Sequence, residues 1–570
     1  MSTSSLRVGN ASGFYGDRFS AFREMLEGGP LDVLTGDYLA ELTMLILGRD
    51  RMKDPDGGFA KTFLRQMEQC LGLAAEKRVK IVTNAGGLNP AGLAAALRAL
   101  AGRLGVKVQI AHVEGDDLLG RTESLGLGTP ITANAYLGAW GIAACLRAGA
   151  DIVVTGRVTD ASLVVGPAAA HFGWKPEDWD ALAGALVAGH VLECGAQATG
   201  GNFSFFTELD VRRPGFPIAE IDASGACVIT KHEGTGGSVT VDTVLAQMLY
   251  EITGARYAGP DVTARFDTVV LSQEGRDRVR ISGARGEPPP PTVKVCLNHL
   301  GGHRNEMTFV LVGLDIEQKA QLVREQLEAS WGKRPREVHW TLVRTDREDA
   351  PTEEQAAAFL RVVVKDPDAK VVGRAFSGAA IELALGSYPG FTLTTPPGDG
   401  APYGVYTPAY IDAGQAEHIA VLPSGERSRI PPSKETRVLA PVDPPALPAP
   451  WPPGPSRRVP LGRIAAARSG DKGGTANIGL WVRTDEAWRW LAHALTVDAL
   501  RELLPEAKAL PIERHVFPQL RGLNFVIDGL LGEGVSSSTR FDPQGKALGE
   551  WLRARHVEVP EALLQGTAPG

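Results

Sequence analysis

Short apolar runs alternate with longer amphipathic stretches through the first 160 residues. The apolar runs predict strands at 6–8, 31–34, 79–82, 106–110 and 152–154. Helices are expected between them, at 17–26, 38–47, 59–75 and 90–104, and an apolar stretch at 132–148 predicts a buried helix. Alternating strands and helices are typical of a parallel sheet covered on both faces. The N-terminal part is therefore predicted to be α/β, with a Rossmann-like parallel-sheet section.

Strand-like runs dominate after residue 200. They lie at 218–221, 227–230, 268–271, 279–281, 293–296 and 307–312. Helical patterns are found at 239–252, 316–331, 353–364 and 375–385. This second pattern predicts an α+β section joined to the parallel sheet. Three further strands, at 462–467, 478–482 and 524–527, predict a small α+β domain at the end of the chain.

A proline-rich segment separates these parts. Residues 441–455 read PVDPPALPAPWPPGP, a composition that favours an extended, semi-rigid spacer. We therefore predict a core domain at 1–440, a linker at 441–458 and a small domain at 459–570. A shorter proline run, Pro288–Pro291, indicates a loop between strands.

Composition excludes several classes of protein. The net charge of −7 gives no basic face for nucleic acid. Five cysteines without a CxxC pair make a disulfide framework or a cysteine zinc site improbable. No apolar run approaches 18 residues, and the N-terminus has no apolar leader. We expect a soluble cytoplasmic homo-oligomer that acts on a small molecule, without nucleic acid, membrane or metal.

Polar residues and glycines follow the predicted strands where each strand ends. Ligands bind at the carboxyl ends of parallel strands, and glycine permits close approach of the backbone. We therefore predict a substrate-binding crevice here, with Asp160 as a catalytic acid or base; the alternative is a set of plain tight turns. The predicted binding residues are Asn10, Ser12, Gly13, Asp37, Asn84, Gly86, Gly87 and Arg157.

The first of these loops admits a dinucleotide interpretation. Gly9, Gly13 and Gly16 follow a strand, and Asp37 ends the next one. The spacing departs from GxGxxG, so the pattern is weak evidence for nicotinamide binding. An alternative use is anion binding by backbone N–H groups where a helix begins near Asp17.

A second glycine loop, 231–238, combines a cation, an imidazole, a carboxylate and a helix N-terminus. His232 and Glu233 are candidate catalytic groups, and Lys231, Gly236 and Gly237 are candidate binding residues. Such a set could hold a carboxylate, a thioester oxygen or a phosphate and move a proton. The alternative is a solvent-exposed turn before a capped helix.

The segment 190–202 carries a carboxylate and a thiol. Glu193 is a candidate general acid or base. Cys194 is a candidate nucleophile with His190 nearby, although most cysteines in apolar surroundings are structural.

Two further polar segments are ambiguous. Arg468, Asp471 and Lys472 lie among glycines between two strands, an arrangement that suits an anion or the acidic edge of a neighbouring domain. A long hairpin turn explains them equally well. His112 with the acidic run 114–117 could ligate a divalent cation, but a solvated acidic turn is the favoured interpretation.

At these same segments the chain resembles the acyclic terpene utilisation (AtuA) family. The matching stretches include GNASGFYGDR, TNAGGLNP, TGRVTDASLVVGPAAAHFGW, GHVLECGAQATGGNF, TKHEGTGGSVTVDTVLAQMLYEI and SYPGFTLTTPPGDGAPYGVY. ARSGDKGGTANIGL and LNFVIDGLLGEGV resemble the family's small C-terminal domain, which implies a ferredoxin-like fold there. The resemblance implies a setting in branched-chain and terpenoid acid breakdown, beside acyl-CoA carboxylase, dehydrogenase and hydratase functions.

Three functional hypotheses follow. The first is an enzyme that performs acid–base chemistry, of the hydration or dehydration type, on a CoA thioester or related acid. Coenzyme A would then be part of the substrate, and the sequence requires no cofactor. The second is an NAD(P)-linked oxidoreductase, and the third is a non-catalytic assembly or binding partner of an acyl-CoA carboxylase system.

Overall fold

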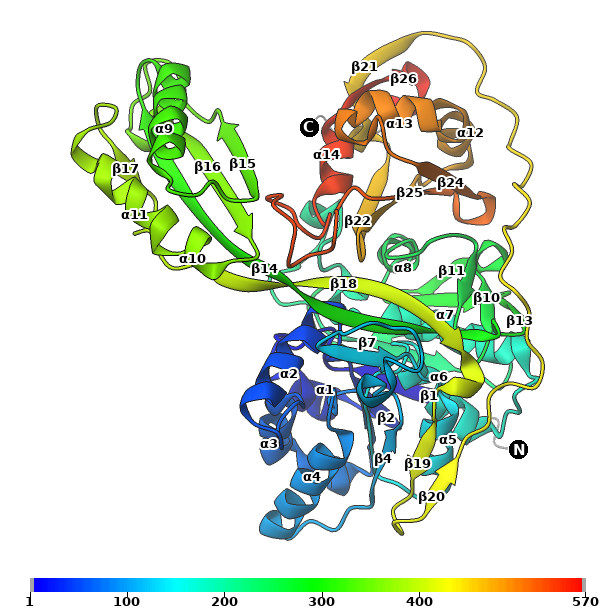
Figure 1. Cartoon of the computed structure of the whole chain (residues 1–570). Helices are drawn as coiled ribbons and strands as arrows, with labels where there is room; N and C mark the ends of the chain where they lie inside the picture. Colours follow the sequence, from blue (N-terminus) through cyan, green and yellow to red (C-terminus); the bar gives the residue numbers. More distant parts are fainter. Residues whose placement is uncertain (1–4, 566–570) are drawn as a thin grey trace. The chain divides into compact units, whose positions relative to one another are not determined.

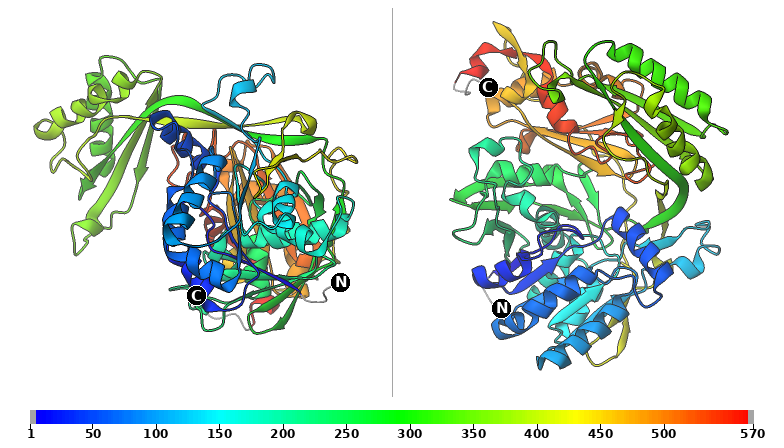
Figure 2. Two further views of the ribbon diagram at one scale, coloured as in Figure 1. Left: turned by 90° about the horizontal axis from the view of Figure 1, so that it is seen from below. Right: turned by 90° about the vertical axis from the view of Figure 1, so that its left-hand side faces the viewer.

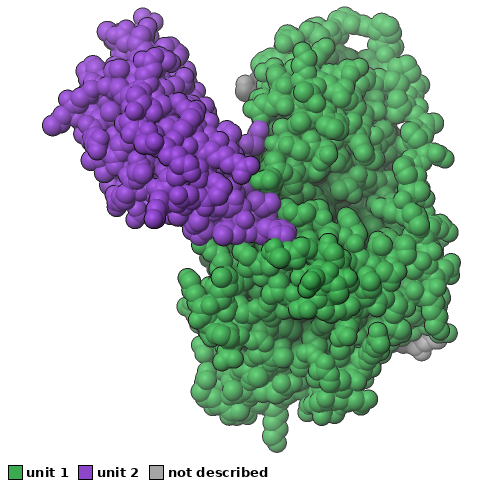
Figure 3. Space-filling model, in the orientation of Figure 1, with its two compact units in different colours: residues 1–298, 406–535, 542–570 green, residues 299–405, 536–541 purple. Residues whose placement is uncertain are grey.

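The computed structural model describes residues 5–565 and divides the chain into two compact units. Unit 2 comprises residues 299–405 and 536–541, and unit 1 comprises the rest (Figure 3). The proline-rich segment therefore lies inside unit 1. Among residues 5–565, no helix is long and apolar enough to cross a membrane.

Five parallel strands form the centre of the main sheet of unit 1. Their order is β1 (Leu6–Asn10), β2 (Val33–Gly36), β3 (Lys80–Thr83), β6 (Ile152–Thr155) and β4 (Ile110–Glu114). Their side chains are buried almost throughout, as expected for parallel strands covered on both faces. The α/β class and the parallel arrangement predicted from the sequence are confirmed.

Antiparallel strands extend this sheet at both edges. The β1 edge continues through β7 (Pro217–Ile221), β8 (Cys227–Lys231), β12 (Arg278–Ser282) and β11 (Val270–Gly275). The β4 edge continues through β19 (Ile419–Val421) and β20 (Arg427–Arg429). The main sheet is therefore mixed, with eleven strands.

Helices cover both faces of the parallel strands (Figure 1, Figure 2). Successive strand residues point to opposite faces of the sheet. Ile81 and Val82, for example, belong to two different apolar clusters, one on each face. The cluster around Ile81 includes α1 (Ala21–Gly28), α3 (Lys61–Lys77) and α4 (Pro90–Leu104). The cluster around Val82 includes α5 (Trp140–Arg147), α6 (Ser162–Phe172), α7 (Trp179–Leu192) and α8 (Val241–Met248).

Two of the predicted helices contain strands in the structure. The stretch 132–148 begins as β5 (Thr132–Ala135), whose backbone pairs with β14 (Thr292–Val312), and only α5 is helical. The stretch 353–364 leads into β16 (Ala357–Asp366), which pairs with β14 on one side and with β15 (Glu337–Val343) on the other. The β-branched run Val362–Val364 suits a strand, and pairing on both sides outweighs the helical preference of the preceding alanines.

Unit 2 folds around its own antiparallel sheet. Its elements follow the order β14, α9 (Ile316–Ser330), β15, β16, α10 (Ala369–Val372), α11 (Arg374–Glu382) and β17 (Thr392–Leu393). The strand order β15-β16-β14-β17 is that of a split βαβ motif. The strand β14 enters unit 2 and β18 (Ala401–Asp412) leaves it.

The C-terminal part of unit 1 holds a four-stranded antiparallel sheet. Its order is β22 (Ala466–Lys472), β23 (Thr475–Trp481), β25 (Gly522–Ile527) and β24 (Ile512–Phe517). Ile478 and Leu480 enter an apolar core with α12 (Asp485–Ala494), α13 (Val497–Leu503) and α14 (Leu548–Ala554). Because strand side chains alternate, Asn477 and Gly479 lie on the opposite face of this sheet. Beside it, β21 (Ser456–Pro460) pairs with β26 (His556–Pro560).

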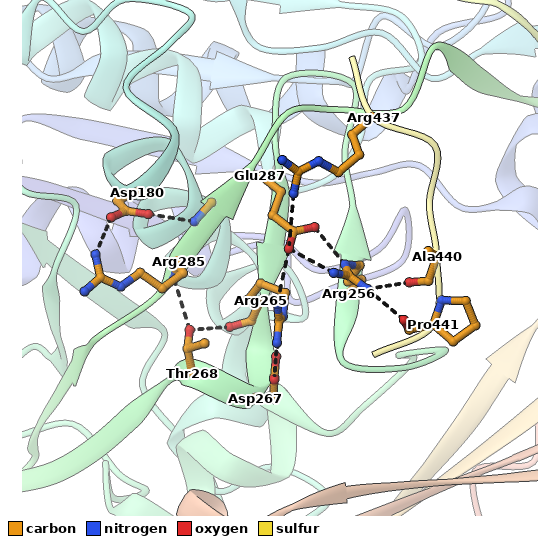
Figure 4. Close-up of polar contacts among 11 residues, drawn as sticks. Asp180, Arg256, Arg265, Asp267, Thr268, Arg285, Glu287, Arg437, Ala440 and Pro441 are labelled. Atoms are coloured by element: carbon orange, nitrogen blue, oxygen red, sulfur yellow. Dashed lines mark hydrogen bonds and ion pairs between the residues drawn. The ribbon is translucent and has the colours of Figure 1, made fainter. Parts of the chain in front are cut away.

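A cluster around Glu287 fixes the start of the proline-rich segment (Figure 4). Glu287 ends β13 (Arg285–Glu287), beside β10 (Thr263–Arg265) and β9 (Arg256–Ala258). Its carboxylate accepts hydrogen bonds from Arg256 Nε at 2.7 Å and Arg265 Nη1 at 3.2 Å. Arg256 Nη1 in turn donates to the carbonyls of Ala440 and Pro441, at 2.6 and 3.0 Å. Residues 440–441 are therefore anchored to the core by charge-assisted hydrogen bonds.

Candidate functional site

The end of β1 holds the end of α7. Asn10 Nδ2 donates to the carbonyls of Leu192 and Glu193, at 2.6 and 3.2 Å. Gly13 packs against the backbone of Cys194, the residue after Glu193. A Cβ at position 13 would lie 2.7 Å from the carbonyl carbon of Cys194. The first strand-end loop and the segment that carries Glu193 are thus brought together.

The ends of β2 and β3 are also joined. Asn84 Nδ2 donates to Asp37 Oδ1 at 2.6 Å, and Asn84 Oδ1 accepts from the backbone N–H of Tyr38 at 2.7 Å. Asp37 is buried, and burial together with the nearby charge of Asp160 raises its pKa well above the usual range. Burial therefore shifts Asp37 toward its protonated form.

Three predicted binding residues shape these loops. Ser12 Oγ donates to the carbonyl of Phe14 at 3.0 Å. A Cβ on Gly86 would lie 2.4 Å from the carbonyl oxygen of Thr155, so only glycine fits there. Gly87 has a φ of 53°, in the left-handed region. The described contacts give these residues a structural part in the site.

Arg157 is a buried cation at the end of β6. Its side chain is 3% exposed, and Nη1 donates to Asp160 Oδ1 at 3.0 Å and to the carbonyl of Leu39 at 3.2 Å. The guanidinium carbon lies 4.2 Å from the centre of the Tyr136 ring. Arg157 therefore connects the loops after β2 and β6.

The acidic turn 114–117 positions this arginine. Asp116 Oδ2 accepts from the backbone N–H of Arg157 at 2.9 Å and from Asn134 Nδ2 at 2.8 Å. The prediction of a solvated turn is wrong for Asp116, which is 3% exposed. Burial raises the pKa of Asp116 to about 7.

Glu41, the first residue of α2 (Glu41–Lys53), anchors a second cation. Its Oε1 lies 3.6 Å from Lys294 Nζ and 3.2 Å from the Tyr136 hydroxyl. Lys294 Nζ is also 4.9 Å from the Tyr136 ring and 5.4 Å from the Tyr406 ring. Burial alone would raise the pKa of Glu41, but Lys294 and Arg157 lower it to about 2, so this group is ionised.

A further group of charges lies where the turn after α8 meets the C-terminal part of unit 1. Lys472 Nζ donates to the backbone carbonyl of Glu251 at 2.9 Å and lies 5.2 Å from the Tyr257 ring. Lys546 Nζ is 3.2 Å from Glu251 Oε1 and 3.5 Å from Asp471 Oδ1. Burial raises the pKa of Glu251 to about 8 and that of Asp471 to about 8, although Lys472 opposes both shifts. Both carboxyls hold protons at neutral pH.

His190 and Glu193 form a buried pair. His190 Nδ1 lies 3.2 Å from Glu193 Oε1, and its ring contacts Tyr257 and Phe266 at centroid distances of 5.1 and 5.4 Å. Burial lowers the pKa of His190 to about 4, whereas burial and the charge of Asp160 raise that of Glu193. At neutral pH the imidazole of His190 is therefore neutral.

These groups act on one another's proton affinity, so they form one set. The carboxyl of Glu251, for example, feels the charges of Lys472, Glu193, Glu41 and Asp160. We call this set the charged cluster, and its members are Asp37, Glu41, Arg157, Asp160, Glu193, Glu251, Lys294, Asp471, Lys472 and Lys546.

Arg468 lies beside the charged cluster. Its guanidinium is hydrogen-bonded to Gln197 Oε1 and sits 4.5 Å from the Tyr250 ring. Burial lowers its pKa, while the nearby Cys194 and Glu251 oppose that shift. The segment forms a hairpin, because β22 pairs antiparallel with β23 up to Lys472 and Thr475, so the hairpin alternative is confirmed.

Cys194 is in the same region but holds its proton. Burial and the neighbouring Glu193 raise the pKa of its thiol well above the usual value. A nucleophilic cysteine needs the opposite shift, because the thiolate is the reactive form. The environment of Cys194 therefore favours a structural role over the predicted nucleophile.

We expect iodoacetamide to alkylate Cys194 more slowly than a free thiol at about pH 7.5, because its thiolate population is small. Mass spectrometry of the intact folded protein after timed exposure would measure this rate. The Cys194→Ala protein serves as the control for labelling elsewhere. Rapid labelling confined to Cys194 would contradict the assignment.

The residues of loop 231–238 make their described contacts with residues outside the charged cluster. Lys231 Nζ donates to the carbonyl of Thr235 at 2.7 Å and lies 3.4 Å from Asp277 Oδ2. The His232 ring hydrogen-bonds the carbonyl of Met25 at 2.9 Å. These interactions explain the burial of two residues predicted to face a ligand.

The rest of that loop also has a structural explanation. Glu233 is exposed. A Cβ on Gly236 would lie 2.5 Å from the carbonyl oxygen of Arg213, and one on Gly237 would lie 2.2 Å from that of Thr199. Both glycines permit close backbone packing, so the candidate residues of this loop have a structural explanation.

The first loop satisfies its own backbone N–H groups. Asp17 accepts from the N–H of Gly13 at 2.8 Å and from that of Arg18 at 2.7 Å. The helix α1 begins only at Ala21, four residues later than predicted. Asp17 thus occupies the place proposed for an anion.

Two family profiles match the chain. The sequence profile described as acyclic terpene utilisation family protein AtuA matches residues 6–422, and that of the AtuA ferredoxin-like domain matches residues 459–558. The chain belongs to the AtuA family. No curated protein and no solved structure matches it. In this AtuA-family chain, the charged cluster draws on both matched segments.

Sequence reasoning on the AtuA-family motifs missed four members of the cluster: Glu41, Glu251, Lys294 and Lys546. Two of them carried a signal. Glu41 follows Asp37 by four residues, so the strand-end argument could have been extended to it. Lys294 interrupts the apolar strand 293–297, where a charged residue needs a partner. Glu251 and Lys546 enter through tertiary packing of the C-terminal sheet, which no local pattern announces.

Proposed function

We propose that this protein is an acid–base enzyme that acts on a carboxylic acid or its CoA thioester, with hydration or dehydration as the reaction type. One observation carries the proposal. Carboxyl groups of widely different proton affinity, Glu41 with a pKa of about 2 and Glu251 with a pKa of about 8, lie in one cluster with several cations. Pairs of titratable groups whose environments separate their pKa values are typical of acid–base catalysis.

Each type of group suits one part of such a reaction. The candidate general acids for a departing hydroxyl are Glu251, whose pKa is raised to about 8, and Glu193, whose pKa is raised by burial. Asp160, held by Arg157, is the candidate base. The cations would hold a carboxylate or polarise a thioester carbonyl, because fixed positive charge in a water-poor site stabilises developing negative charge. The candidates for that role are Arg157, Lys294 and Lys472.

The family description guides the choice of compounds. Because the family is named for acyclic terpene utilisation, we propose branched-chain and terpenoid acids as the first substrate class. The nicotinamide-linked alternative has less support, since Asp17 takes the N–H groups on which it depends. The assembly hypothesis leaves the charged cluster unexplained, because a non-catalytic partner does not need acid–base groups.

The test is a thermal-shift screen of the purified protein with branched acids, their CoA thioesters, coenzyme A, NAD(P) and ATP. A ligand at about 100 times its Kd adds roughly 2.7 kcal/mol to the folded state. A shift with an acid or thioester, followed by turnover of that compound, would support the proposal. A shift with NAD(P) alone would favour the oxidoreductase, and silence together with a stable partner in a pull-down would favour assembly.

A matched pair of lysine variants locates the binding. Lys472 lies 5.2 Å from the Tyr257 ring, and Lys365 of unit 2 lies 5.3 Å from the Tyr403 ring. We expect Lys472→Met to abolish the ligand-induced shift and Lys365→Met to preserve it. Equal retention by both variants would place the ligand elsewhere.

A further inference from the structure

The turn that follows α8 has an unusual backbone. Glu251 has a φ of 54°, a left-handed conformation that side chains other than glycine and asparagine rarely adopt. Such a conformation persists only where the surroundings fix it, and it occurs disproportionately at functional sites. The question is which contacts hold Glu251 in place.

Four hydrogen bonds reach this turn from the C-terminal sheet. The backbone N–H of Glu251 donates to Asn477 Oδ1 at 2.8 Å, and its carbonyl accepts from Lys472 Nζ at 2.9 Å. Asn477 Nδ2 donates to the carbonyl of Leu249 at 2.8 Å, and Asn524 Nδ2 donates to that of Ile252 at 3.1 Å. Both asparagines are buried. The end of α8 is thus capped by side chains from another sheet.

The two asparagines also hold each other. Asn477 Nδ2 contacts Asn524 Oδ1 at 2.7 Å across neighbouring strands. Two glycines of the sheet make room for the turn: a Cβ on Gly470 would lie 2.4 Å from the Tyr250 ring, and one on Gly479 would lie 2.5 Å from Leu249 Cβ. The face of this sheet that is turned away from its own core is therefore shaped to fit one turn of the N-terminal part.

We propose that Asn477 and Asn524 are positioning residues, and that the C-terminal domain completes the site by setting the backbone of Glu251. The domain does so while contributing Asp471, Lys472 and Lys546 to the charged cluster. The inference builds on the proposed function but concerns the placement of one carboxyl, so it can be tested without a substrate.

The test follows the protonation of Glu251 in the full-length protein. Infrared difference spectra over a pH titration show carboxyl groups that lose a proton, and the band absent from the Glu251→Gln protein belongs to Glu251. This assignment is needed because Asp471, Lys472, Lys546, Glu41, Glu193 and Asp160 surround the group and titrate or carry charge. The wild-type midpoint provides the reference.

We expect Asn477→Ala to move that midpoint down by about one pH unit or more, because a relaxed turn lets water reach the carboxyl. The matched control is Asn305→Ala in unit 2, since Asn305 Nδ2 also donates to two backbone carbonyls, those of Val372 and Gly398. Asn305→Ala should leave the midpoint unchanged.

An unchanged midpoint in a folded Asn477→Ala protein would overturn the proposal, whatever the substrate proves to be. If that variant does not fold, Asn524→Ala makes the same test from the Ile252 side, and its midpoint should also fall. A normal midpoint in Asn524→Ala would then count against the proposal. Conversely, a shifted midpoint in a protein that turns over no acid would support the positioning role and reject the proposed function.

Discussion

The Glu251→Gln protein is expected to be more stable than the wild type above about pH 6 and to lose most of its turnover. Folding raises the pKa of Glu251 to about 8. Between the usual pKa of a glutamate and pH 8, this carboxyl is ionised in the unfolded chain and protonated in the folded one, so ionisation favours the unfolded chain. Wild-type stability therefore falls as pH rises through this window, and glutamine removes that loss. The gain should be on the order of 2 kcal/mol, and turnover should drop about 10²–10⁴-fold.

Melting curves at about pH 5 and pH 8 and a turnover assay on the compound found by the screen measure both effects. The matched control is Glu287→Gln, which removes a carboxylate that binds Arg256 and Arg265 away from the charged cluster. These arginines lower the pKa of Glu287, so its replacement should reduce stability and spare turnover. A Glu251→Gln protein with full activity would exclude Glu251 as the general acid.

Arg157→Met should have the second large effect, a loss of about 3–5 kcal/mol of folding free energy together with loss of ligand binding. The methionine leaves the carboxylate of Asp160 without its guanidinium partner and removes one of the cations that lower the pKa of Glu41, so the charge balance of the cluster is lost. Arg157→Lys should recover only part of both losses, because an ammonium cannot reproduce the contacts to Asp160, Leu39 and the Tyr136 ring. Denaturant unfolding and the thermal-shift assay measure the two quantities.

Arg361 in unit 2 offers a close control. It contacts a carboxylate, a backbone carbonyl and an aromatic ring, those of Glu306, Thr539 and Phe541. Arg361→Met should lower stability yet leave ligand binding intact. Loss of binding in both variants would mean that the effect is general destabilisation and not the removal of a binding group.

The parallel sheet was predictable because apolar runs and glycine-rich strand ends are local patterns. Local patterns also selected Asp37, Arg157, Asp160 and Glu193, which the ends of β2 and β6 and the end of α7 bring together; their part in a reaction stays a prediction. They also selected His232, whose loop looks equally rich in chemistry. The His232 ring hydrogen-bonds the carbonyl of Met25. A single sequence gives no distances, so it could not reveal this contact.

The failures have a common physical cause, which is pairing over long sequence distances. The stretch 132–135 forms a strand because β14, some 160 residues away, supplies its hydrogen bonds. Glu251 joins the charged cluster because Asn477 and Lys546 approach it from the C-terminal domain. Single-sequence periodicity contains no information about either approach.

The path of the chain between its units limits how the protein can be shortened. Residues 536–541 belong to unit 2, where Arg304 Nη1 donates to the carbonyls of Ser536 and Ser538 at 3.0 Å each. A fragment that ends at the proline-rich segment would remove these acceptors from unit 2 as well as the lysines from the charged cluster. Removal of the chain after residue 440 therefore takes contacts from both units, so the C-terminal segment cannot be cut away as a self-contained module.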